Sequence, residues 1–306
     1  MTSITLAESA YLSQDMLMKG VIQSTITVDR FFDLLPFTPI HGNALAYNRE
    51  SIIGDSQGLA VGGTITATAA ATVTPVSTSL KTLIGQSEVN QLIQATRSNI
   101  NDQMAYQIAS KAKSVGRLFQ NYLINGVSST TQFDGLLTLV DAGKTIASTG
   151  ADGDVLSLAK LDELLDQVTD KDGQVDYIMM HSRELRTYYN LLRALGGASI
   201  GETVTLPSGV QIPAYRGVGI FKNDWIPVNQ TRGASSAATS IIAGTIDDGS
   251  GMVGISGLTA ENAAGMMVED VGIHQSKDEK LIRVKWYTAV ALYSLNGLAV
   301  STGIVQ

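Results

Sequence analysis

The stretch NINDQMAYQIASKAKSVGRLFQNYLIN, residues 99–125, carries the clearest periodic pattern in this chain of 306 residues. Its apolar residues recur at steps of three or four, which places them on one stripe of a 3.6-residue helical period. No proline interrupts the stretch, and the residue after it is Gly126, a residue type that often ends helices in a left-handed conformation. The pattern therefore predicts one helix of about 27 residues, roughly 40 Å long, with other elements packed along it.

Composition places the chain among globular proteins, because 44% of its residues are hydrophobic and only 16% are charged. The net charge of −7 argues against a protein that grips nucleic acid through its phosphates, although an acidic wall around nucleic acid is compatible with it. Cysteine is absent, which excludes disulfides and thiolate metal sites. No segment resembles a signal peptide or a membrane span, so we expect a soluble chain made inside the cell, without membrane association.

A second unusual stretch, residues 57–80, contains no charged residue and reads QGLAVGGTITATAAATVTPVSTSL. Threonine alternates there with alanine, isoleucine and valine, which predicts a long strand pair. Exposed strand edges without charges tend to pair with other chains. Within residues 57–80, Pro75 is the only residue of a type that prevents such pairing. We therefore expect another copy of the chain to cover the loop, so the sequence itself indicates self-assembly.

The remaining segments mix helices and strands without a regular alternation, and no internal repeat is found. Helical spacing predicts helices at 86–98, 156–168 and 183–195, the last of them with Ser182 as its N-cap. Alternating patterns predict strands at 44–53, 175–180, 203–206, 210–215, 220–227, 240–246, 265–273, 280–294 and 297–304. The fold class is therefore α+β.

Motifs for catalysis occur only in weak form. A G-x-S-x-G motif surrounds Ser199, and Asp224 and His274 follow it in the order found in hydrolases. The motif leaves a predicted helix and enters a strand, however, whereas a nucleophile elbow needs a strand before the serine and a helix after it. None of the three histidines has a second one at metal-ligand spacing. We therefore expect no enzyme, no cofactor and no metal.

Three groups of residues are candidates for contacts between subunits. The apolar cluster FFDLLPF (31–37) would be unfavourable as a free tail in water, so we expect it to lie against another surface, such as a neighbouring subunit. Charges flanking the uncharged loop could form ion pairs between subunits, and cations along the helices could meet acidic residues or enclosed nucleic acid. Plain solvated charges remain the alternative interpretation. The candidates are Phe31, Phe32, Phe37, Arg49, Glu50, Asp55, Lys81, Arg97, Lys111 and Arg117.

Taken in order, these parts resemble the major capsid proteins of tailed bacteriophages, the family with the Hong Kong 97 fold. The resemblance rests on the N-terminal arm, the junction LLPFTPIHGNALAYNRE (34–50), the uncharged loop and the long helix. It continues with Asn121–Gly126 followed by FDGL at 133–136, and with the last two strands. It implies an N-arm, an extended loop hairpin, a long spine helix on a peripheral-domain sheet and an inserted axial domain.

The implied domains are the N-terminal arm at 1–43; the extended loop and its base strands at 44–85; the peripheral domain at 86–133 and 266–294, with spine helix 99–125; and the axial domain at 134–265 and 295–306. The resemblance further implies self-assembly into pentamers and hexamers of an icosahedral phage head that encloses double-stranded DNA. The chain would be part of the virion, assembled in the cytoplasm of the bacterial host.

The partners implied are further copies of this chain, a separate scaffolding protein, a portal protein and a decoration protein, with non-specific proximity to packaged DNA. Covalent crosslinking through a lysine is not expected, because Lys81 lies at the base of the loop rather than at its tip. Two alternatives stay open. An encapsulin-type shell shares the fold and ranks second, and a serine hydrolase that uses Ser199 ranks third.

Overall fold

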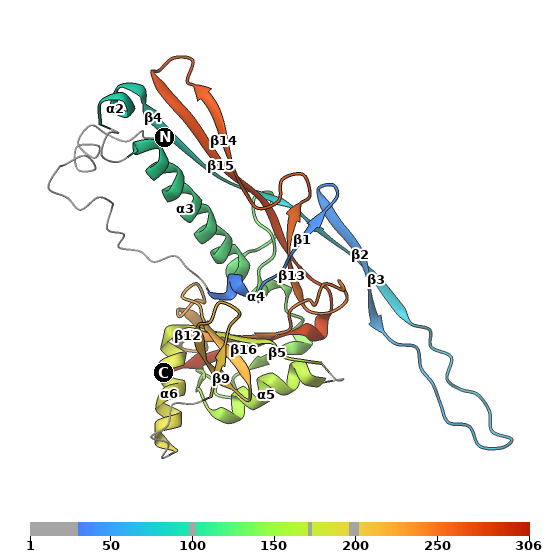
Figure 1. The fold of residues 1–306 in the computed structure, drawn as a ribbon. Helices are drawn as coiled ribbons and strands as arrows, with labels where there is room; N and C mark the ends of the chain where they lie inside the picture. Colours follow the sequence, from blue (N-terminus) through green and yellow to red (C-terminus); the bar gives the residue numbers. More distant parts are fainter. Residues whose placement is uncertain (1–29, 98–101, 171–172, 196–201) are drawn as a thin grey trace.

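The computed structural model describes residues 30–97, 102–170, 173–195 and 202–306 (Figure 1). The predictions for the first 29 residues of the N-terminal arm and for Ser199 lie outside the described residues. The described chain contains two main sheets and a hairpin that projects away from both, joined near the lower end of a long helix (Figure 1).

The first sheet has five strands and is organised around β15 (Glu279–Leu292), the longest of them. Its order is β1 (Phe37–Ile40), β13 (Ile255–Ala260), β15 and β14 (Met266–Ile273), and β4 (Lys81–Asn90) also pairs with β15. The pairing of β4 with β15 is antiparallel and runs from Thr288↔Lys81 to Glu279↔Asn90. The sheet thus joins segments that are about two hundred residues apart in sequence.

The helix α3 (Gln103–Asn125) lies along this sheet, beside β4 and β15 (Figure 1). The predicted helix is confirmed, but it begins later than predicted, because the Asp102 carboxylate caps it by accepting hydrogen bonds from the backbone N–H groups of Met104 and Ala105. The face that the apolar stripe predicts is the buried one, and Phe119 on it is fully buried. Its ring lies 4.7 Å from that of Trp286 on β15, measured between centroids.

The end of α3 at Gly126 is as predicted, but the reason is different. Gly126 has a φ of −58°, which is not the left-handed conformation expected of it. A Cβ atom at this position would instead collide with the backbone carbonyl oxygens of Phe133 and Tyr122. The glycine therefore allows the chain to fold back closely on the helix end.

The second sheet has nine strands and forms the lower body in Figure 1. Its order is β5 (Thr145–Ala147), β16 (Leu298–Val305), β12 (Ser235–Gly244), β7 (Tyr177–Met180), β10 (Val218–Lys222), β9 (Gln211–Tyr215) and β8 (Thr203–Thr205), with β11 (Gln230–Arg232) on β12 and β6 (Asp154–Val155) on β16. Helices α5 (Leu158–Thr169) and α6 (Ser182–Ala194) pack on it through a core that includes Leu164, Tyr188 and Ile241. Short helical elements complete the described chain: η1 (Arg30–Asp33), α2 (Gln91–Arg97), α4 (Leu136–Leu139), η2 (Ala142–Lys144) and η4 (Leu295–Gly297).

The projecting hairpin pairs β2 (Ala44–Ile52) with β3 (Thr72–Ser79) in antiparallel fashion. The predicted long strand pair is wrong beyond these strands, because residues 53–71 form no strand. Small residues dominate that segment, and the hairpin has no third strand to pair with in the described chain, so little stabilises a regular ladder there. The segment extends far from the body as an open loop (Figure 1).

Three further predictions need correction. Residues 86–90 belong to β4 rather than to a helix, because the long-range pairing with β15 outweighs their helical spacing. The axial domain is predicted to extend to residue 265. Strand β13, which lies within that range, pairs with β15 in the first sheet instead, so this segment leaves the second sheet before residue 255. The N-cap of α6 is His181 rather than Ser182, since its ring Nδ1 accepts the backbone N–H of Arg183 at 3.1 Å.

Candidate assembly surfaces

The base of the projecting hairpin is anchored to the end of β15. Tyr47 donates its hydroxyl to the carbonyl oxygen of Leu292 at 2.6 Å, and its ring packs edge-on against Tyr293 at 5.4 Å between centroids. Arg49 donates from Nε to the carbonyl oxygen of Tyr293 at 2.9 Å and from its second terminal nitrogen to that of Leu292. Burial raises the pKa of Tyr293, so its hydroxyl stays neutral at this joint. Arg49 thus makes these hydrogen bonds within its own subunit, and its pairing with a neighbour stays a prediction.

The tip of the loop is held by one side chain that the sequence prediction missed. The Gln57 side-chain oxygen accepts hydrogen bonds from the backbone N–H and the hydroxyl of Thr66, at 2.7 and 2.6 Å, and from the N–H of Ala67 at 2.7 Å. Its amide nitrogen donates to the carbonyl oxygen of Thr64 at 3.0 Å. The sequence does single out Gln57, because it carries the only amide side chain in the uncharged stretch 57–80.

Around this bracket the loop presents apolar side chains to solvent. Val61 at the tip is fully exposed, and Ile65, Leu59 and Ile53 are each more than half exposed. Apolar groups presented this far from the body are typical of a surface that a partner covers. The projecting loop is therefore the surface of the described chain best suited to contact another molecule.

The two acidic candidates lie on this hairpin and its loop. Glu50 is on β2 and Asp55 is in the loop, and both are exposed without an ion pair to any described residue. They stay candidates for contacts with a neighbour. Lys81, by contrast, donates to the carbonyl oxygen of Ser129 at 2.7 Å within its own subunit.

The basic candidates are not gathered in one place. The methylene stem of Lys111 on α3 passes over Gly85 of β4. The Arg117 guanidinium, further along α3, lies 5.2 Å from the ring centre of Trp225. Arg97 is the last residue of α2, at the other end of the first sheet. The line of cations predicted along the helices is therefore interrupted by contacts inside the subunit.

The aromatic candidates near the N-terminus belong to the subunit's own core. Phe31 is 1% exposed, and its ring lies 5.0 Å from that of Tyr177 in the second sheet. The rings of Phe32 and Phe37 lie 5.5 and 5.8 Å from that of Phe119. The cluster thus packs on its own chain in the described subunit, and a contact of these residues with a neighbouring subunit stays a prediction. The position of Phe31 between the two sheets explains its burial.

The residues of the weak hydrolase motif are not shown to converge. Asp224 pairs with Lys222 at 3.0 Å and lies 3.9 Å from His181, whereas His274 caps the turn after β14 by accepting the N–H of Ser276. No cluster of three or more potential metal ligands occurs among the described residues. Within the same part of the chain, no helix is both long enough and apolar enough to cross a membrane.

Comparison with known proteins agrees with this geometry. The sequence model of the SU10 major capsid protein matches residues 56–205, which include the loop, β4 and α3. The structure is similar to the SrpI encapsulin complex of Synechococcus elongatus PCC 7942, with a TM-score of 0.74, 19% identity, and 99% of this chain and 97% of that chain covered.

Two further capsids are similar as well. The cyanophage A-1(L) capsid gives a TM-score of 0.71 at 12% identity, covering 99% of this chain and 100% of that one. The capsid of a native GTA particle gives 0.67 at 14% identity and covers 99% of both chains. No curated protein matches the sequence.

The two sheets, the long helix and the projecting loop define a protein with the Hong Kong 97 fold. Within that class, the match over residues 56–205 is to a phage major capsid protein, and the resemblance predicted from the sequence is confirmed.

Proposed function

We propose that this chain assembles into pentamers and hexamers that close into the icosahedral head of a phage around double-stranded DNA. One observation carries the proposal: a loop without charges, apart from Asp55, projects from the body with its base anchored by Arg49 and its tip bracketed by Gln57. An ordered apolar loop held away from its own core has no function inside an isolated subunit. Such a loop is suited to lie over a neighbouring copy of the chain and hold it, a role called a clasp below.

The strength of such a shell comes from repetition. Each loop covers a modest apolar area, and at about 25 cal/mol per Å² it contributes only a few kcal/mol. A subunit in a closed shell both gives a loop and receives one, so several weak contacts must break together before it leaves. The role is structural rather than catalytic.

The other expectations extend this proposal. A separate scaffolding protein, a portal protein and a decoration protein would act with the shell, which would be assembled in the cytoplasm of the bacterial host and then form part of the virion. Packaged DNA would lie near the inner surface without specific contacts, consistent with a chain of net charge −7.

The decisive experiment removes the loop without disturbing its base. Residues 57–67 are replaced by a short Asn-Gly turn, which keeps β2, β3 and the backbone hydrogen bond from Asp55 to Ala69. We expect the unaltered chain to form shells or rings by sedimentation and negative-stain microscopy, and the variant to stay a folded subunit with an unchanged denaturation midpoint. Normal shells from the variant would refute the proposal.

An encapsulin-type compartment is the second candidate, favoured by the TM-score of 0.74 to the SrpI complex. Both readings expect shells, so assembly alone does not separate them. Particles isolated from the natural source would contain DNA for a phage head and protein cargo for a compartment. The ratio of absorbance at 260 and 280 nm, followed by mass spectrometry of the contents, decides between the two.

A further inference from the structure

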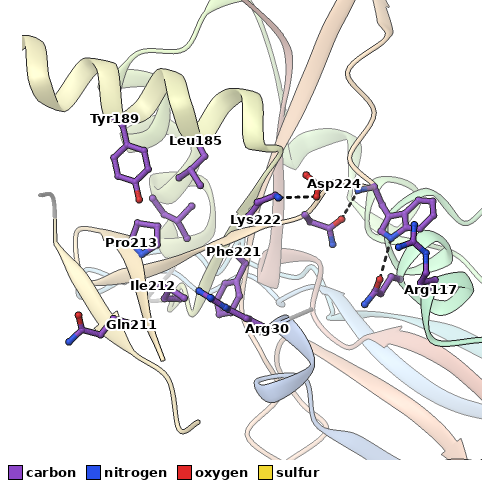
Figure 2. A pocket seen from close by; sticks show the side chains of 14 residues that line it. Arg30, Arg117, Leu185, Tyr189, Gln211, Ile212, Pro213, Phe221, Lys222 and Asp224 are labelled. Atoms are coloured by element: carbon purple, nitrogen blue, oxygen red, sulfur yellow. Dashed lines mark hydrogen bonds and ion pairs between the residues drawn. The ribbon is translucent and has the colours of Figure 1, made fainter. Parts of the chain in front are cut away.

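A pocket of about 690 Å³ lies on the second sheet, on the side where α3 ends (Figure 2). Its walls come from α6, from β9 and β10, and from the turn after β10, and η1 and α3 close the opposite side. This pocket is remote from the projecting loop and has no role in the clasp described above. Residues from segments nearly two hundred positions apart, Arg30 and Trp225, meet on it.

Positive charge gathers on one half of the pocket. Arg30, Arg117 and Lys222 line it, against the single carboxylate of Asp224, which leaves an excess of two positive charges on a chain whose net charge is −7. Arg30 is exposed and has no partner among the described residues. The Arg117 guanidinium stacks over the ring of Trp225 and pairs with no carboxylate of the described residues. Only Lys222 has its charge matched, by Asp224 at 3.0 Å.

The other half of the pocket is lined mainly by apolar side chains, with Gln211 beside them. Leu185 and Tyr189 project from α6 toward Ile212 and Pro213 of β9, as Figure 2 shows. The charged and the apolar halves meet at β10, where Phe221 and Lys222 are adjacent. A ligand that fills the pocket must therefore present negative charge on one side and apolar groups on the other.

We propose that this pocket binds an acidic peptide segment carrying apolar side chains, supplied by a second protein such as the scaffold that would direct assembly. This inference rests on the proposed capsid function for the identity of its partner, but the chemistry comes from the pocket. Arginine forms paired hydrogen bonds with carboxylates, and two of the three cations pair with no carboxylate in the part of the chain that the structure describes. Duplex DNA fits less well, because its phosphates gain nothing from the apolar wall and are repelled by Asp224.

Trp225 makes binding measurable in the intact subunit. The chain has two tryptophans, and the other, Trp286, is 5% exposed in the core between β15 and α3. A synthetic peptide of glutamate and leucine should change the Trp225 emission in a saturable way, and the affinity should fall as salt is added. The same peptide with lysine in place of glutamate should not bind.

Charge variants of the pocket test the assignment. The double variant Arg117→Gln, Lys222→Gln should weaken binding of the fluorescently labelled peptide at least about tenfold, as measured by polarisation. Asp224→Asn should strengthen binding about threefold, because it removes the opposing carboxylate and frees Lys222. This gain cannot come from a misfolded subunit. Lys277→Gln, which removes a charge outside the pocket, should leave the affinity unchanged within about twofold.

The outcomes separate this inference from the proposed function. No saturable binding, equal binding of the lysine peptide, or an unchanged affinity in the double variant would overturn it, even if shells form normally. Tighter binding of a short DNA duplex than of the acidic peptide would also overturn it and assign the pocket to nucleic acid. Peptide binding by a chain that forms no shells, even after a candidate scaffold is added, would support the pocket while refuting the capsid proposal.

Discussion

Replacing Gln57 with methionine should leave the subunit folded and impair its assembly. Methionine keeps the length of the side chain but makes none of the four hydrogen bonds that close the loop tip. The loop would then sample many conformations in the free subunit and would have to be ordered when it docks. The entropy lost when the loop becomes ordered opposes association, so the substitution should weaken assembly rather than folding.

The magnitude follows from the hydrogen bonds. A hydrogen bond contributes about 0.5 to 1.5 kcal/mol net, and these are exposed, so the lower value applies and the four together contribute roughly 2 kcal/mol. At 1.4 kcal/mol per factor of ten, a subunit that docks one loop should need a critical concentration for assembly about 25-fold higher. Methionine also adds apolar surface, which favours docking. Any loss of assembly would therefore be observed despite this opposing effect.

Light scattering against protein concentration measures the critical concentration, and hydrogen exchange at the amides of Thr66 and Ala67 reports the bracket itself, because both donate to the Gln57 oxygen. Thr68→Ala is the matched control, since Thr68 is an exposed loop residue without a side-chain hydrogen bond among the described residues. If exchange accelerates in the methionine variant while the critical concentration stays within about twofold, the reasoning is refuted.

Two further predictions concern the body. Phe119→Ala should lower the free energy of unfolding by about 3 to 5 kcal/mol in urea denaturation, because it opens a cavity where α3 meets Trp286, and a loss below about 1.5 kcal/mol would contradict this. The Lys160 ammonium, 2.8 Å away, holds the pKa of Asp154 well below its usual range. The pair therefore stabilises the fold above the ordinary carboxyl pKa of about 4 and loses this effect as pH falls below it, so the acid-side decline in denaturation midpoint should be shallower in Asp154→Asn.

The sequence was sufficient for features that depend on neighbouring residues. The period of residues 99–125 predicts α3 and its buried face, and the turn after Leu206 appears where Pro207, Ser208 and Gly209 predict it, with Gly209 at a φ of +81°. Each of these properties is set by local spacing or local composition.

Features that depend on distant partners were missed. Residues 86–90 have helical spacing, yet they form a strand because residues 279–283 supply a ladder for them. Arg49 flanks an exposed loop in sequence, and only the fold reveals that the carbonyl groups of Leu292 and Tyr293 lie within its reach. The pocket around Arg117 combines five separate elements, so no sequence window could contain it.

The anchoring of the hairpin explains how a thin loop can hold a shell subunit. A pull on the tip passes along β2 and β3 to Tyr47 and Arg49, which bind the carbonyl groups at the end of β15. That strand pairs with β4, β13 and β14, so the force is spread over many hydrogen bonds of the first sheet instead of opening one hairpin. If the loop clasps a neighbour as proposed, its weakest point is the span between the bracket at Gln57 and the base. There a single backbone hydrogen bond, from Asp55 to Ala69, joins the two sides.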